Sequence, residues 1–330
     1  MSRSIFTLIT ILTFIISLSI EAQKLSDGSP LAHTYSIVAR DTVTGEMGVA
    51  VQSHWFSVGA IVTWGEAGVG VVATQSFVNP AFGPNGLKLM KEGLPAPDVV
   101  DKMIAEDEGR DFRQLAVLDI NGNVKAYTGA KCIEGAGHIV GKNFSVQANM
   151  MLNDKVWGAM ALAFETTEGP LAERMIVALE AAQNVGGDIR GKQSAAILVV
   201  RGESTGKLWE DRLVDLRVED HPEPVKEIRR LLKVHRAYEH MNNGDLAVEH
   251  GDMEKAMAEY SAAEAMFPEN LEMKYWHAVT LVNNGGLEEA LPMFKEVFTK
   301  DENWRTMTPR LIDNGLLVVT EEQLKIIISQ

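Results

Sequence analysis

Residues Thr34-Tyr35-Ser36-Ile37-Val38-Ala39-Arg40 decide the fold class of this chain, because an alternating run rich in apolar and β-branched residues is typical of a strand. A turn at Thr44-Gly45 separates this run from a second expected strand, Met47–Ser53. The same pattern predicts further strands at residues 60–64 and 69–75. The chain is therefore expected to begin its fold with a sheet.

Strands and helices then follow in blocks rather than one by one. Helices are expected in pairs, at residues 87–92 and 97–105 and again at 155–165 and 170–184. This order predicts an α+β fold of two packed antiparallel sheets with helices outside each, and it argues against a parallel sheet. The remaining strands are expected at residues 114–119, 123–128, 144–150, 194–201 and 213–218.

One connection in this region has a distinct turn signal. Asn121-Gly122 stands between two strand-like runs. Both residue types accept the positive φ values of a type I′ turn, so the dipeptide predicts a β-hairpin with that turn.

Beyond His221-Pro222-Glu223-Pro224 the sequence reads as helical throughout, starting with a long helix at residues 225–238. A motif of small and aromatic residues that starts at Gly251 recurs at Gly285, an offset of 34 residues. This period predicts tetratricopeptide-like helix pairs over residues 223–330, with residues 34–222 forming the first domain. Two repeats fall below the usual minimum of about three, so we expect them to dock onto that domain.

The amino terminus has the pattern of a secretory signal peptide. Met1-Ser2-Arg3-Ser4 precedes an uncharged apolar run at residues 5–20, and Ala22 is the best cleavage site. An uncleaved anchor is the alternative, but this run is short for a bilayer core of about 30 Å. Residues 1–22 are thus expected to be removed, leaving residues 23–33 as a linker or propeptide. The mature protein would be exported, periplasmic or extracellular, with no stable membrane span.

Composition and charge exclude several classes of function. The net charge is −14 and the pI about 5.1, so no basic surface is expected to bind nucleic acid. The chain has no zinc-binding His-Glu-x-x-His, phosphate-binding loop or Gly-x-Ser-x-Gly motif, so neither a metal nor a cofactor is expected. The glycines at residues 68–73 superficially fit a dinucleotide fingerprint, but they lie in an expected strand with no helix after it.

A series of short motifs also runs in order along the first domain. It resembles the family catalogued as domain of unknown function 1028, whose fold is that of the N-terminal-nucleophile hydrolases. The resemblance implies a four-layer αββα sandwich and makes hydrolysis of amide bonds the first hypothesis for the activity. The motifs lie at residues 33–41, 48–53, 67–70, 73–75, 79–80, 127–129, 137–138, 147–150, 170–174, 186–188, 190–196 and 215–218.

The same resemblance implies a role for Thr34. In such hydrolases the first residue of the first strand is the nucleophile, and its own α-amino group is the base. Thr34 can act in this way only if the residues up to His33 are removed by a second cleavage after the signal peptide. The alternative is that Thr34 is simply a β-branched strand residue.

Further candidate residues follow from their chemistry. Asn149 and Gln147 could donate to an oxyanion, and the pair Ser53-His54 ends a strand where it could face a ligand. Ordinary sheet, loop and ion-pair roles are the alternatives for all of them. Cys132 and His138 share a Gly-rich loop and form a weaker candidate pair. A further catalytic possibility is a nucleophile within the chain, Cys132 or Ser53, with His54 or His138 as the neighbouring base. Candidates for binding a substrate carboxylate or carbonyl are Arg40, Asp41, Gln75, Gln147, Asp188, Arg190 and Gln193.

Two functions are compatible with these observations. The first is an exported amide-bond hydrolase with Thr34 as nucleophile and a small-molecule or peptide substrate. The second is a non-catalytic protein that holds a ligand in a degenerate hydrolase fold and binds a protein partner through the helical repeats. The first residue of the mature chain distinguishes the two, because only the hydrolase needs a free amine on Thr34.

Overall fold

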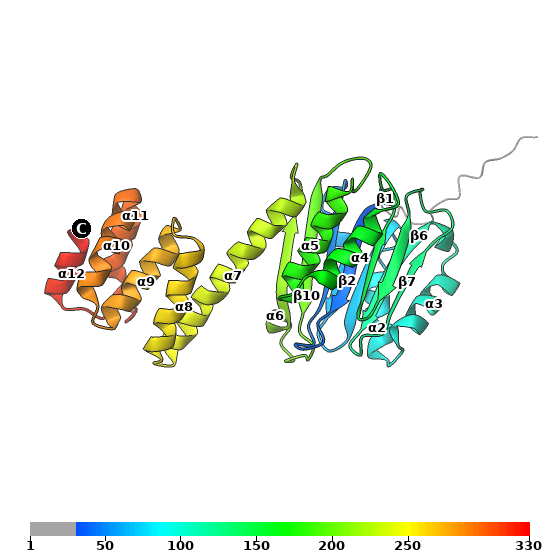
Figure 1. The fold of residues 1–330 in the computed structure, drawn as a ribbon. Helices are drawn as coiled ribbons and strands as arrows, with labels where there is room; N and C mark the ends of the chain where they lie inside the picture. Colours follow the sequence, from blue (N-terminus) through cyan, green and yellow to red (C-terminus); the bar gives the residue numbers. More distant parts are fainter. Residues whose placement is uncertain (1–30) are drawn as a thin grey trace, which may run out of the picture.

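The computed structural model describes residues 31–330, which form two regions (Figure 1). The expected signal peptide at residues 1–22 and residues 23–30 of the expected linker lie outside the described residues. The first region is α+β, with two antiparallel sheets and helices. The second region, from helix α7 onward, is all-helical. Both the α+β class and the switch to helix were predicted from the sequence.

A six-stranded antiparallel sheet carries the strand that decides the fold class. β2 lies at its centre between β3 and β9, and the register places Thr34 opposite Ser53. Helices α4 (Val156–Thr166) and α5 (Leu171–Asn184) cover its outer face, where apolar side chains of both layers form one cluster. In spatial order the strands are β11 (Arg212–Val218), β10 (Ser194–Val200), β3 (Met47–Ser53), β2 (Thr34–Arg40), β9 (Phe144–Ala148) and β8 (Gly137–Gly141).

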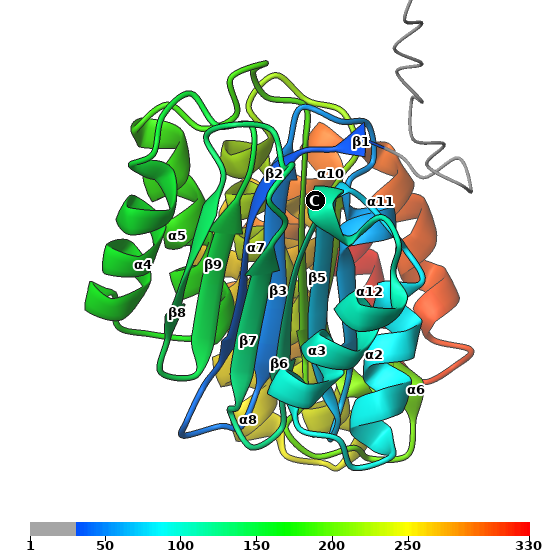
Figure 2. The same ribbon diagram turned by 90° about the vertical axis from the view of Figure 1, so that its right-hand side faces the viewer.

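A five-stranded antiparallel sheet faces the first one (Figure 2). Helices α2 (Phe82–Lys91) and α3 (Ala96–Glu106) pack on its outer face. The short strands β1 (Leu31–Ala32) and β4 (Thr63–Glu66) pair with different parts of the same edge of β5. The other strands, in order, are β5 (Gly70–Phe77), β6 (Arg113–Asp119) and β7 (Val124–Thr128).

The space between the sheets is filled mainly by small and β-branched side chains. Val38, Val49 and Val51 of one sheet meet Val71 and Leu118 of the other, and all five are fully buried. Burying such side chains is the main favourable contribution to folding. Toward the Thr34 end of β2 this apolar layer gives way to polar side chains, and the candidate site lies there.

Some local details differ from the sequence-based expectations. The expected strand at residues 60–64 begins as helix α1 (Gly59–Val62), and extended structure starts only at Thr63. The hairpin at Asn121-Gly122 is present, but only Gly122 has a positive φ, 81°, so the turn is not type I′. The Asp119 side chain accepts hydrogen bonds from the backbone of Asn121 and Asn123, and this fixes the different turn. Strand β8 was not predicted from the sequence, because its exposed edge position produces no clear apolar alternation.

The helical region begins with α7 (Pro224–Glu249), at the last residue of the Pro-rich stretch. Helices α8 (Met253–Met266) and α10 (Leu287–Lys300) begin and end 34 residues apart, in agreement with the repeat in the sequence. None of the described helices is long and apolar enough to cross a membrane. The remaining elements are η1 (Arg110–Phe112), α6 (Leu208–Asp211), α9 (Leu271–Asn283), α11 (Glu302–Met307), η2 (Thr308–Leu311) and α12 (Glu321–Ile328).

Candidate functional site

Thr34 is the first residue of β2 and is completely buried. Alternation along the strand places Tyr35 and Ile37 against the outer helices, so Thr34 and Ser36 point between the two sheets. The Thr34 hydroxyl has no hydrogen-bond partner among the described residues. Buried polar atoms nearly always have a partner, so this hydroxyl needs an explanation other than fold stability.

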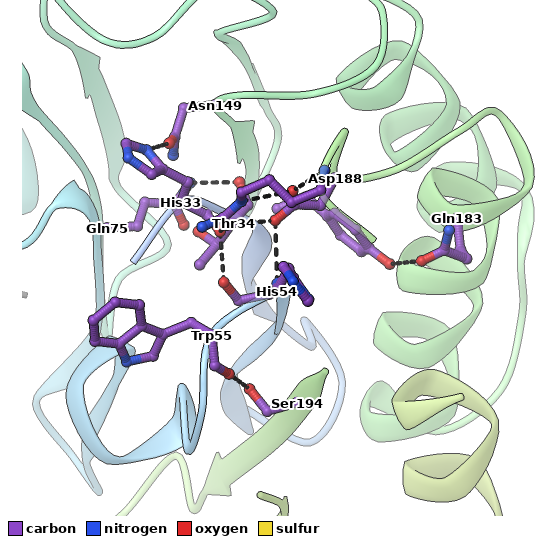
Figure 3. A network of polar contacts seen from close by, with 12 residues as sticks. His33, Thr34, His54, Trp55, Gln75, Asn149, Gln183, Asp188 and Ser194 are labelled. Atoms are coloured by element: carbon purple, nitrogen blue, oxygen red, sulfur yellow. Dashed lines mark hydrogen bonds and ion pairs between the residues drawn. The ribbon is translucent and has the colours of Figure 1, made fainter. Parts of the chain in front are cut away.

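The peptide bond before Thr34 is held from both sides (Figure 3). The His33 carbonyl oxygen accepts a hydrogen bond of 2.5 Å from the Ser53 hydroxyl and one of 2.8 Å from Nη2 of Arg190. Upstream, Ala32 lies opposite Ser76 in the short β1–β5 ladder. Two donors, one of them a cation, thus draw electron density from the carbonyl that Thr34 follows.

Arg190 is held in place by Asp188. Its guanidinium donates to both carboxylate oxygens, with Nε at 3.0 Å from Oδ1 and Nη2 at 2.7 Å from Oδ2. The Asp188 side chain is fully buried and also accepts a hydrogen bond from the backbone N–H of His54 at 3.1 Å. His54 therefore takes part through its backbone, while the residue as a whole is exposed. This pairing fixes the guanidinium toward the His33 carbonyl and reduces the number of conformers it can adopt.

The His33 ring is almost completely buried and makes two contacts. Its Nδ1 lies 2.7 Å from Oδ1 of Asn149. Its plane meets the Phe77 ring edge-on, with centroids 5.4 Å apart. Burial lowers the pKa of His33 below its ordinary value and outweighs the opposing effect of the hydrogen bond that the ring donates to the Asn149 oxygen, so the ring is neutral at pH 7.

A buried network of amide side chains connects the surroundings of the His33 ring to the space between the two sheets. Gln114 donates through Nε2 to the Ala148 carbonyl, and its Oε1 accepts from Gln75 at 2.5 Å and from Asn149 at 2.9 Å. Gln147 donates to Ser36 at 2.6 Å. Side chains from β2, β5, β6 and β9 are therefore joined directly behind Thr34.

The structure thus gathers most of the predicted site residues at one end of the sheets. Arg40 and Gln193 are among the exceptions: the first lies elsewhere, and the second contacts the site through its backbone. Arg40 is at the opposite end of β2, beside a surface hollow of about 550 Å³. The backbone N–H of Gln193 donates to Ser53. Residues that converge around Thr34 are Ser53, His54, Gln75, Gln147, Asn149, Asp188 and Arg190.

The weaker pair, Cys132 and His138, does not come together as a catalytic pair. The Cys132 thiol donates to the Arg113 carbonyl, and burial raises the pKa of this thiol. Nδ1 of His138 instead bonds the Thr128 hydroxyl at 2.8 Å. A thiol with a raised pKa and no neighbouring base is a poor nucleophile at neutral pH.

Sequence reasoning missed the part played by Gln114 and by the two donors on the His33 carbonyl. One signal for Gln114 was available, since a glutamine at the start of an otherwise apolar strand has to find hydrogen bonds inside the fold. Asn149 was expected as an oxyanion donor, but here its amide donates to Gln114. Within residues 31–330 no three His, Cys, Asp or Glu side chains cluster in a way that could hold a metal ion.

Together the fold and the site define an α+β protein with two facing antiparallel sheets and a buried threonine at the start of a central strand. The chain belongs to the family described as a family of unknown function, DUF1028, whose family model matches residues 34–228. That match begins at Thr34 and ends in the first turns of α7.

Protein SPO2555 from Silicibacter pomeroyi, a structure whose title assigns it to the same family, is similar to this chain. The two are 30% identical with a TM-score of 0.56, and the match covers 61% of this chain and 85% of that chain. No curated protein matches the sequence.

Proposed function

We propose that this protein is an exported amide-bond hydrolase of the N-terminal-nucleophile type that cleaves its own chain between His33 and Thr34 to become active. One observation carries the proposal: a buried threonine hydroxyl that has no partner among the described residues directly follows a carbonyl that Ser53 and Arg190 polarise. The order of layers, helices outside two facing sheets, supports assignment to that fold type. Helices that recur after 34 residues support tetratricopeptide-like repeats, which could recruit a peptide or protein partner.

The proposed self-cleavage is an acyl shift followed by hydrolysis. The Thr34 oxygen adds to the His33 carbonyl carbon, and Ser53 and Arg190 stabilise the oxyanion that develops. The C–N bond then breaks, the Thr34 nitrogen takes up the proton that the Thr34 hydroxyl has lost, and an ester links His33 to the threonine oxygen. Water hydrolyses this ester, leaving a carboxylate on His33 and a free amine and hydroxyl on Thr34.

The same groups then serve an external amide. The freed α-amine, with a pKa near 8, can take the proton from the Thr34 hydroxyl, as N-terminal nucleophiles require. Departure of His33 leaves Ser53 and Arg190 without the carbonyl they hold, ready for that of a substrate. Asp188 keeps the guanidinium in place throughout.

The decisive measurement is the intact mass and N-terminal sequence of the chain purified from the exported fraction. The wild type and Thr34→Ser are expected to begin at residue 34. Thr34→Ala is expected to keep the residues before it and to lack amidase activity. Thr74→Ala is a matched control, because Thr74 is an equally buried threonine on β5 whose hydroxyl has a backbone partner.

A second candidate function rests on a different observation. Ala32 and His33 are buried, and the β1–β5 pairing holds the chain that precedes Thr34. A protein that keeps this segment would use the fold to bind a ligand and not to catalyse a reaction. A wild-type chain that begins near Gln23, with the same mass pattern as Thr34→Ala, would overturn the hydrolase and favour this binding protein.

A further inference from the structure

The residues in front of Thr34 occupy a defined position in the site. His33 inserts its ring between Asn149 and Phe77, and Ala32 lies along β5. In the self-cleavage proposed above, the intermediate is an ester between the His33 acyl group and the Thr34 oxygen. An external substrate would form an ester with the same oxygen and the same carbonyl donors. Its acyl group must therefore lie where His33 and Ala32 lie now.

We infer that the space now filled by the His33 ring, between Asn149 and Phe77, is the acyl subsite of the mature enzyme; we call it the His33 pocket. The substrates are then peptides cleaved after histidine, or after another small flat residue that carries a neutral N–H donor. This inference rests on the proposed function. Beyond that function, it says that the enzyme recognises the acyl side of the scissile bond and which interactions recognise it.

The hydrogen-bond network determines which ligand the pocket prefers. The carbonyl of Ala148 accepts from Nε2 of Gln114, so the Gln114 amide is oriented with its oxygen toward Asn149. Asn149 must then donate its NH₂ to that oxygen and turn its own oxygen toward His33. The pocket thus offers a fixed acceptor 2.7 Å from the ring nitrogen, and His33 meets it with a protonated Nδ1.

The rest of the pocket favours a neutral ring. The aromatic edge-to-face contact with Phe77 suits a flat side chain. Arg190 lies close to His33, since its guanidinium holds the backbone carbonyl of that residue, and it disfavours a second positive charge there. Lysine or arginine at this position would be repelled, while phenylalanine would fit but leave the Asn149 oxygen unpaired.

The strand pairing extends recognition upstream. β4 covers residues 70–73 of the β5 edge, and β1 covers Ser76 and Phe77. When β1 leaves, those two residues regain a free edge that can bind an extended peptide by strand addition. A substrate should therefore carry at least two residues before the histidine, as the chain itself does with Leu31 and Ala32.

Fluorogenic peptide amides test this subsite on a chain beginning at Thr34, released from a removable fusion partner. The probe acetyl-Leu-Ala-His-aminomethylcoumarin is compared with the same peptide ending in Phe or Lys. We expect kcat/KM roughly 10- to 100-fold lower for Phe, from the loss of one buried hydrogen bond, and lower still for Lys. Acetyl-His-aminomethylcoumarin should have a higher KM than the tripeptide.

Binding separates a wrong subsite from a wrong function. Calorimetry with acetyl-Leu-Ala-His and acetyl-Leu-Ala-Phe carboxylates, the cleavage products, needs no turnover. Preference for the His peptide without hydrolysis of any amide would support the subsite and overturn the proposed function. Amidase activity with equal affinity for both peptides would support the function and overturn the subsite.

Full-length chains give a second, independent measurement that does not depend on the shortened chain folding. His33→Phe should slow self-cleavage, and His33→Lys should slow it more, as followed by intact mass. Asn149→Leu should bring the His-to-Phe ratio of kcat/KM close to one, because it removes the acceptor and keeps the side-chain size. Equal cleavage rates for all three residues at position 33 would overturn the subsite.

Discussion

The two ends of strand β2 face the same opposing sheet but are built differently. At the Arg40 end the layer between the sheets is apolar, with Val38 packed against residues such as Val71 and Leu118. At the Thr34 end the same layer holds Thr34, Ser36 and four amide side chains that are hydrogen-bonded across the strands. Networks of this kind stabilise a fold only when every member is satisfied. The Thr34 hydroxyl beside this network has no partner among the described residues, and we expect function at this end of the strand.

The largest expected effect at the polar end is on the rate of self-cleavage. Ser53→Ala removes one of the two donors on the His33 carbonyl and leaves Arg190 to satisfy that oxygen. Losing one oxyanion donor typically slows a reaction about 100- to 1,000-fold, so the precursor should persist for far longer in a mass-spectrometric time course.

Ser194→Ala is a suitable control, because Ser194 lies opposite Ser53 on β10 and holds the loop after β3 through Trp55 instead. Equal slowing by both variants would mean that the fold, and not the carbonyl, is affected.

The apolar end should respond to mutation through stability instead. Leu118→Ala removes a fully buried side chain between the sheets. Similar substitutions cost about 2–5 kcal/mol, and a value near 3 kcal/mol is expected in urea unfolding monitored by circular dichroism. Self-cleavage under native conditions should proceed at the wild-type rate. A large loss of cleavage at unchanged stability would contradict the division between the two ends.

Gln114→Leu should produce an intermediate result, because it affects both stability and the site. The amides of Gln75 and Asn149 would each lose a partner in the interior. We expect a loss of about 2 kcal/mol in unfolding free energy, from buried polar groups left unpaired, together with slower cleavage. A variant as stable and as fast as the wild type would show that Gln114 does not position this site.

The smallest effect is a pH dependence that belongs to the uncleaved chain. Burial lowers the pKa of His33 in the folded state, so the unfolded state binds more protons as the pH falls. The stability contributed by the neutral ring is complete above the unfolded pKa of about 6.5 and decreases as the pH falls through the folded pKa. His33→Gln in a Thr34→Ala background should make the thermal midpoint less sensitive to acid between pH 7 and pH 5. An unchanged pH profile would contradict this assignment.

Much of the sheet structure could be predicted from the sequence, because β2, β3 and β10 are buried strands rich in apolar and β-branched residues. The edge strand β8 could not be predicted, since its exposed position gives no clear apolar alternation. The type of turn at Gly122 could not be predicted either, since hydrogen bonds to the Asp119 side chain select it.

The candidate site could likewise be predicted only in part. Chemistry alone suggested Ser53, Asn149 and Arg190 as candidates. Which of them contacts the His33 carbonyl depends on strand register and on the Asp188 pairing, and neither can be read from residue spacing.

Helix α7 has a consequence for how the molecule unfolds. Over 26 residues, a length of about 39 Å, it places Val225, Ile228 and Leu232 in the core beneath the six-stranded sheet, and Ala237 and Met241 in the first helical core. One rigid element is thus shared by two cores, so melting either core removes packing from the other. A force applied to the repeats would be transmitted to the six-stranded sheet through helix α7, because this continuous helix joins the two regions. The two regions should therefore denature in one cooperative transition, and a truncation at residue 222 would remove three core side chains from the sandwich.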